Sequence, residues 1–177
     1  MRVTGPGPTR TSVVGVAEAV ARLALLAVPE GPPWRVVSLP GLVVLKLLAW
    51  QDRSEQRGKE DSDLRLLVQY YGELADAELF AHHADLLNSP DDTGGCLTLA
   101  GAQLLGRQVQ QVVASNAALR ERVAALLNQE AAAGTDSRLA EAMRLSTGFT
   151  DKAPTLAWCV AVLAARRAGL LEEWGND

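Results

Sequence analysis

The feature that most restricts the fold is the stretch 42–50, in which every residue but Lys46 is apolar. Pro40 lies just before it, and a proline suits the first turn of a helix because no acceptor is needed there for its missing N–H. A helix that is apolar on all sides is buried by neighbours on several faces. The stretch therefore predicts an interior helix of a helical bundle.

The chain after this stretch keeps the apolar spacing of helices, punctuated by glycine and short polar residues. We expect further helices over 60–71, 76–87, 97–114, 117–133, 136–145 and 154–171, with a loop at 88–95. No internal repeat or coiled-coil heptad runs through these segments. The pattern predicts a helical bundle over residues 40–177.

The chain before Pro40 has a different character. Residues 1–12 form a polar arm with glycine and proline, and residues 13–24 have the apolar spacing of a short helix. Two apolar runs, 23–28 and 34–39, flank a Gly/Pro turn at 29–33 and predict a β-hairpin. The expected fold class is α+β, mainly α, with a short helix and hairpin over 13–39 followed by the bundle.

Composition narrows the function classes. The 177 residues are 48% apolar and 21% charged with a net charge of −4, which indicates a globular chain and argues against a general nucleic-acid coat. The two cysteines, Cys96 and Cys159, lack metal spacing, which excludes a disulfide scaffold and fits a reducing compartment. The longest apolar run, 156–165, is too short to span a membrane. We expect a cytoplasmic protein with no membrane partner.

Lys46 is the most informative single position. A buried, unpaired ammonium is very costly, so this side chain must reach water along its stem, pair with a carboxylate or meet an anionic ligand. A lysine whose stem runs to the domain edge is the commoner arrangement. An anion-binding lysine is the functional alternative.

A mixed cluster of charges follows the apolar stretch. It offers cations for phosphate oxygens and carboxylates that either bind a metal ion or orient a lysine. Its acidic members also lie where a helix N-terminus favours negative charge, at roughly 0.3–1 kcal/mol each. The cluster consists of Arg53, Arg57, Lys59, Glu60, Asp61 and Asp63.

Two blocks of sequence resemble part of the AbiEii-like nucleotidyltransferase family, which includes toxins of toxin–antitoxin and phage-defence systems. The first block is 39–50, followed by Asp52-Arg53 and by the Lys-Glu-Asp-Ser-Asp-Leu run at 59–64. The second is Ala-Gly-Ala-Gln-Leu-Leu-Gly-Arg at 100–107. The family shows a lysine inside an apolar helix, an arginine shortly after it, and a Lys-Asp-x-x-Asp-Leu pattern opening the next helix. The resemblance extends over about residues 14–127.

The resemblance assigns roles to individual residues. It implies that Lys46 contacts the nucleotide phosphates or polarises the transferred group, and that Asp63 is the second acid of the family pattern. Lys59 matches the lysine of that pattern and joins the nucleotide-binding residues. Lys46 and Asp63 are therefore the expected catalytic residues.

The remaining cations and acids have supporting roles by the same resemblance. Glu60, also an expected nucleotide-binding residue, stands where the family usually has Asp, and the adjacent Asp61 is able to compensate for the difference in length. Arg53 and Arg57 would be supporting cations, with Arg53 among the nucleotide-binding residues.

One departure from the family bears on activity. The wider polymerase-beta-like superfamily depends on a Gly-Ser turn followed by an Asp-x-Asp pair that holds Mg²⁺ against the triphosphate. Residues 1–38 contain no Gly-Ser and no Asp, and the triplet at 61–63 opens a helix instead of following a strand. The resemblance thus implies the C-terminal portion of such an enzyme, with residues 13–39 as a remnant of its α/β lobe. We expect little transfer activity from this chain alone, although Mg²⁺ with a nucleoside triphosphate would serve the intact family.

A non-catalytic helical interaction or regulatory module is the alternative function. In that case the two strands would offer a free sheet edge to another polypeptide, such as a chain supplying the missing lobe or an antitoxin.

Metal binding has weaker support. His82 and His83 point about 100° apart on a helix and make a poor site with Asp85, so no metal ligand is assigned.

Overall fold

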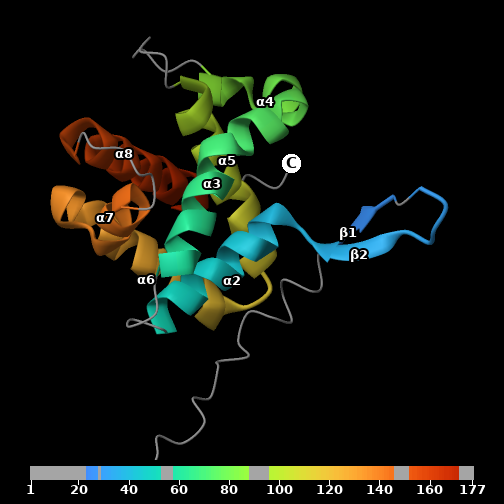
Figure 1. Cartoon of the computed structure of the whole chain (residues 1–177), viewed down its shortest axis with the longest axis horizontal. Helices are drawn as coiled ribbons and strands as arrows, with labels where there is room; N and C mark the ends of the chain where they lie inside the picture. The colour runs from blue at the N-terminus through green and yellow to red at the C-terminus, as the bar shows by residue number, and fades with distance from the viewer. Residues whose placement is uncertain (1–22, 28, 53–57, 88–95, 146–151, 172–177) are drawn as a thin grey trace, which may run out of the picture.

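The computed structural model describes residues 23–27, 29–52, 58–87, 96–145 and 152–171, without the side chains of 58–62, 96 and 152–160. Its N-terminal part is a hairpin of strands β1 (Leu23–Leu26) and β2 (Trp34–Val37). The strands are antiparallel, with Leu23 opposite Val37 and Leu26 opposite Trp34. The hairpin projects to one side of a bundle of helices (Figure 1). The expected α+β, mainly α fold is confirmed, with strands shorter than predicted.

The bundle follows directly. Its α-helices are α2 (Leu39–Asp52), α3 (Gly58–Leu74), α4 (Asp76–His82), α5 (Cys96–Val113), α6 (Ala117–Ala132), α7 (Arg138–Leu145) and α8 (Lys152–Leu171), with 3₁₀ turns at η1 (Ala84–Leu87) and η2 (Gly134–Asp136). The order of the helices matches the sequence prediction, except that the predicted helix over 76–87 is divided into α4 and η1. The loop predicted at 88–95 lies outside the described residues. The predicted helix over 13–24 lies outside the described residues, except for Leu23 and Ala24, which belong to β1.

The start of α2 follows from local chemistry. The hydroxyl of Ser38 accepts a hydrogen bond from the N–H of Gly41 at 3.3 Å, and the Ser38 carbonyl accepts from the N–H of Leu42 at 2.8 Å. Pro40 lies in the first turn, where its missing N–H leaves no acceptor unsatisfied. The helix therefore begins at the junction with the hairpin.

Helix α5 is the centre of the bundle, and glycines allow its close crossings. A Cβ on Gly101 would lie 2.5 Å from the Cα of Gly72 in α3, and a Cβ on Gly106 would lie 2.2 Å from the carbonyl oxygen of Arg166 in α8. Gly72 is thus a packing contact inside α3. The helix continues to Leu74, three residues beyond the end predicted at that glycine.

The hydrophobic core gathers around α5. Fully buried leucines and valines come from α2, α3, α5, α6, α7 and α8, so a single core unites the bundle. The largest members include Leu47, Leu64, Leu104, Leu105, Leu127, Met143 and Leu163. None of the described helices is both long enough and apolar enough to cross a bilayer.

One predicted helix is interrupted, and another starts later than predicted. The segment 76–87 breaks at His83, whose backbone (φ −133°, ψ 35°) leaves the helix and separates α4 from η1. The segment 136–145 starts later, at Arg138, because Ser137 and Glu130 cap α7. The Ser137 hydroxyl accepts from the N–H of Ala140 at 3.0 Å, and the buried Glu130 carboxylate accepts from the Ser137 hydroxyl at 2.7 Å.

Candidate functional site

Lys46 and Asp63 form the ion pair around which the predicted site is built. The ammonium of Lys46 lies 2.5 Å from Oδ2 of Asp63, and the two side chains are 21% and 36% exposed. Lys46 thus pairs with a carboxylate, which is one of the three arrangements that the sequence leaves open to it. Its stem crosses the apolar surface of α2 while its charged end stays in reach of water.

The packing of α2 on α3 explains the contact. Lys46 is followed by the fully buried Leu47, and Asp63 is followed by the fully buried Leu64. Burial of these leucines fixes the rotation of each helix and leaves the preceding residues at the boundary of the α2–α3 contact. The pair is thus positioned by core packing between residues 17 apart.

The chemistry available to the pair is limited and specific. A partly exposed ion pair contributes about 0–1 kcal/mol to stability, so the fold does not depend on the Lys46–Asp63 pair. The ammonium is a point charge of the kind that binds phosphate oxygens. An adjacent carboxylate restricts the rotamers of the lysine and directs its ammonium outward.

The structure does not describe the side chains of the other predicted site residues. Arg53 and Arg57 lie outside the described residues, and Lys59, Glu60 and Asp61 lie in the first turns of α3 without described side chains. Their roles stay predictions from the resemblance.

Sequence reasoning missed a second charged cluster at the end of α2. Arg122 of α6 is paired with Asp52, and its Nε donates to Oε1 of Gln51 at 2.6 Å. The two partners lie 70 residues apart in sequence, so no local pattern announces the contact. The cluster fixes the C-terminal end of α2 against α6.

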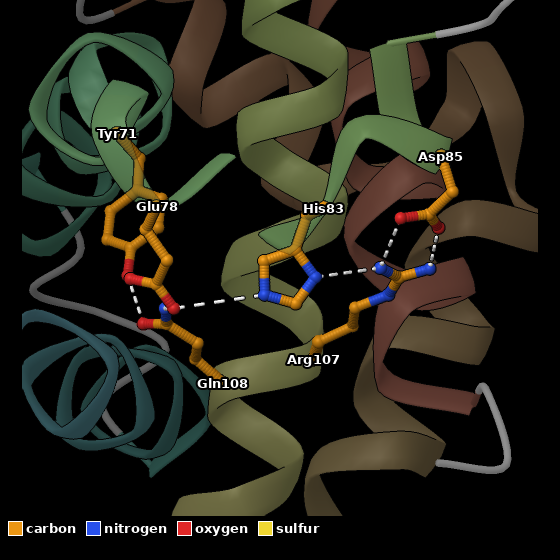
Figure 2. A network of polar contacts seen from close by, with 6 residues as sticks. All are labelled: Tyr71, Glu78, His83, Asp85, Arg107 and Gln108. Atoms are coloured by element: carbon orange, nitrogen blue, oxygen red, sulfur yellow. Dashed lines mark hydrogen bonds and ion pairs between the residues drawn. The ribbon is translucent and has the colours of Figure 1, made fainter. Parts of the chain in front are cut away.

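A polar network joins α3, α4, η1 and α5 at another end of the bundle (Figure 2). Arg107 contacts Nδ1 of His83 at 3.1 Å and Oδ2 of Asp85 at 2.5 Å. On the other side, Nε2 of His83 lies 3.8 Å from Oε1 of Glu78. The network ends where Gln108 donates to Glu78 at 2.7 Å and accepts from the hydroxyl of Tyr71.

The contacts fix the protonation of His83. Arginine carries only donors, so Nδ1 must accept and the ring proton must lie on Nε2, toward Glu78. Burial and the nearby Arg107 lower the pKa of His83, while the hydrogen bond from Arg107 lowers the pKa of Asp85. Burial raises the pKa of Tyr71 well above its usual range, so it is no base at neutral pH. The network is suited to tying helices together and to sensing pH.

Arg166 is the most unusual charge of the described residues. Its side chain is fully buried in α8, and none of its guanidinium nitrogens has a hydrogen-bond partner among the described residues. Burial lowers its pKa to about 9, so it remains charged at neutral pH. Its burial depends on the close α5–α8 crossing at Gly106.

The described residues do not form a metal site. No three of their His, Cys, Asp or Glu side chains gather around a point where an ion would fit. The Asp63 carboxylate is bound to Lys46, whereas Mg²⁺ prefers a set of oxygen ligands. His83 and Asp85 are both bound to Arg107.

The chain was compared with protein-family models, with curated proteins and with solved structures, and no match was found in any of the three.

Proposed function

We propose that this chain acts as the C-terminal part of a nucleotidyltransferase-like protein and presents Lys46 and Asp63 to a nucleotide. The observation that carries the proposal is the 2.5 Å pair between these two side chains on packed helices. In this function Lys46 binds phosphate oxygens, and Asp63 holds its ammonium in place. No step of the proposal runs through a metal ion.

The surroundings of Lys46 support an anionic ligand. Helix α2 carries no other charge before Asp52, and Asp52 is itself paired with Arg122. The Lys46 side chain is 21% exposed, so part of it is in contact with solvent. A phosphate that adds to this pair gains the attraction of the ammonium without desolvating a fully buried charge.

Nucleotide binding is the direct test. Isothermal titration with ATP, GTP, CTP and UTP in turn should give a dissociation constant that rises about tenfold or more in Lys46→Ala, equivalent to about 1.4 kcal/mol. Arg120→Ala is the matched control, because Arg120 is an exposed cation of α6 and should leave binding unchanged. Equal binding by wild type and Lys46→Ala would remove the proposal.

Activity is a separate measurement. We expect little or no transfer of labelled nucleotide by this chain, because residues 1–38 contain neither the Gly-Ser turn nor the Asp-x-Asp pair on which the polymerase-beta-like superfamily depends. Robust Mg²⁺-dependent transfer would show that the chain is complete for catalysis and contradict this part of the proposal.

A second candidate function, a non-catalytic interaction module, is favoured by the exposed hairpin. Leu25 and Trp34 are more than half exposed on its two strands. The titration distinguishes the two functions, since an interaction module that binds no nucleotide gives no heat of binding with any of the four nucleotides.

A further inference from the structure

An exposed apolar strip of α3, made of Leu66 and Tyr70, leads away from the Lys46–Asp63 pair. These two residues follow Asp63 at intervals of three and four, the spacing that places side chains on one face of a helix. Asp63 and Tyr70 are seven residues apart, so they lie within about 20° of each other around the helix axis. Leu66 is 41% exposed and Tyr70 is 43% exposed. The ion pair and the strip thus face solvent on one side of α3.

The ring of Tyr70 extends toward the ion pair. Long side chains of an α-helix point back toward its N-terminus and cover the preceding turn. For Tyr70 that turn holds Leu66, and the turn before it holds Asp63. The neighbouring Tyr71 is buried in the core, so the bundle uses one of the two adjacent tyrosines and leaves the other at its surface. Tyr70 therefore offers an aromatic ring next to the site.

The spacing along the strip agrees with the length of a nucleotide. Seven residues of helix rise about 10.5 Å, at about 1.5 Å per residue. An extended nucleoside triphosphate covers a comparable length from its terminal phosphate to its base. A ligand whose terminal phosphate is held by Lys46 thus brings its base to Tyr70.

The charges of α3 favour an anionic ligand along the strip. From residue 64 to residue 72 the helix contains no acid, and its single charged residue is the cation Arg65. An anion that lies along the strip therefore meets no repulsive side chain of α3 in these two turns beyond Asp63. The Asp63 carboxylate is itself bound to the ammonium of Lys46.

An apolar partner surface is the alternative occupant of the strip. Such a surface would cover Leu66 and Tyr70, but it would bring no anion to Lys46. A nucleotide has a charged end and a flat aromatic end, in the order in which the pair and the strip offer a cation and a ring. The nucleotide therefore explains both features with one ligand.

We propose that Tyr70 is the base-binding residue of the Lys46 site and that its ring stacks on the base of a nucleoside triphosphate. The inference rests on the proposed function, since it takes the phosphate contact of Lys46 as given. Every base has a π-face, so the site accepts all four nucleotides. ATP and GTP bind more tightly than CTP and UTP, because a purine has the larger surface for stacking.

Isothermal titration with ATP and with inorganic tripolyphosphate tests the proposal, because tripolyphosphate carries the phosphates without a base. Tyr70→Leu removes the ring and keeps an apolar side chain with good helix propensity. This variant should raise the Kd of ATP at least about fivefold and leave that of tripolyphosphate unchanged. Lys46→Ala should raise the Kd of both probes about tenfold.

Two further variants serve as controls. Tyr70→Phe keeps the ring and should bind ATP like wild type. Phe80→Leu removes an aromatic side chain that is 62% exposed on α4, outside the strip, and should also leave the Kd of ATP unchanged. The advantage of ATP and GTP over CTP and UTP should shrink in Tyr70→Leu alone.

The possible failures are distinguishable. If Tyr70→Leu binds ATP as tightly as wild type while Lys46→Ala weakens binding, the inference is overturned and the phosphate site stands. Equal losses for ATP and tripolyphosphate in Tyr70→Leu would also overturn the inference, because they would show that the residue supports the structure of the site and does not contact the base. A wild type that binds neither probe would overturn the proposed function, and this inference with it.

Discussion

Arg107 donates to Nδ1 of His83 across 3.1 Å, and this contact selects the neutral imidazole. Protonation at Nδ1 would remove the acceptor and place two cations in contact. Glu78, at 3.8 Å from the other ring nitrogen, favours protonation but is half exposed and more distant. His82, next in the chain, and Asp85, on the far side of Arg107, are the other charged groups nearby. The effects of burial and of Arg107 on the pKa of His83 are larger than those of Glu78 and Asp85, so this pKa is lowered.

The lowered pKa makes stability depend on pH. A histidine with a folded-state pKa below its unfolded value of 6.5 stabilises the fold fully above that pH, and the contribution is lost as the pH falls through it. The free energy of unfolding should therefore drop between about pH 7.5 and about pH 5, and His83→Gln should flatten this slope. Urea denaturation at several pH values measures it. His82→Gln, an exposed neighbour, should keep the wild-type slope, and an identical slope in both variants would contradict the assignment.

We expect that replacing the buried Arg166 by an apolar residue stabilises the fold. Within the part of the chain that the structure describes, its buried guanidinium has no hydrogen-bond partner. Replacing a buried charge by an apolar side chain of similar volume often stabilises a fold by about 1–4 kcal/mol. Arg166→Met should raise the free energy of unfolding by about that amount in chemical denaturation. Arg167→Met is the control, since Arg167 is exposed and donates to Asn128, and its effect should stay within about 0.5 kcal/mol. A less stable Arg166→Met would show that a water or an ion satisfies the guanidinium.

The sequence predicted helix order better than helix contacts. Apolar spacing and the caps around Ser38 and Asn116 act within a few residues, so the starts of α2 and α6 were close to their predicted positions. The contact of His83 with Arg107 joins residues 24 apart in sequence, and local patterns carry no signal of it. Lys46 was found because a lone charge in an apolar helix needs a partner. Arg166 was missed because its burial comes from the α5–α8 crossing.

The glycines at that crossing predict a large loss of stability. A Cβ on Gly169 would lie 1.9 Å from the carbonyl oxygen of Gln103, a backbone atom that cannot rotate away. Gly169→Ala should lower the free energy of unfolding by at least about 3 kcal/mol in denaturant titration. Gly134→Ala is the contrast, because Gly134 has open space around its Cα and only its φ of 54° opposes a side chain. Its cost should be about 1 kcal/mol. Equal losses would mean that α5 and α8 are not in close contact there.

The Lys46–Asp63 pair should contribute little to stability, which makes it available for binding. Both side chains are partly exposed, and such pairs have coupling energies of about 0.2–1 kcal/mol. Lys46→Met keeps the apolar stem and removes the charge, while Asp63→Asn removes the partner charge at nearly constant size. A double-mutant cycle of these variants in urea should give a coupling in that range, reduced in high salt. A coupling of several kcal/mol would instead mark a pair on which the α2–α3 contact depends, and a loss of nucleotide binding in Lys46 variants would then report unfolding.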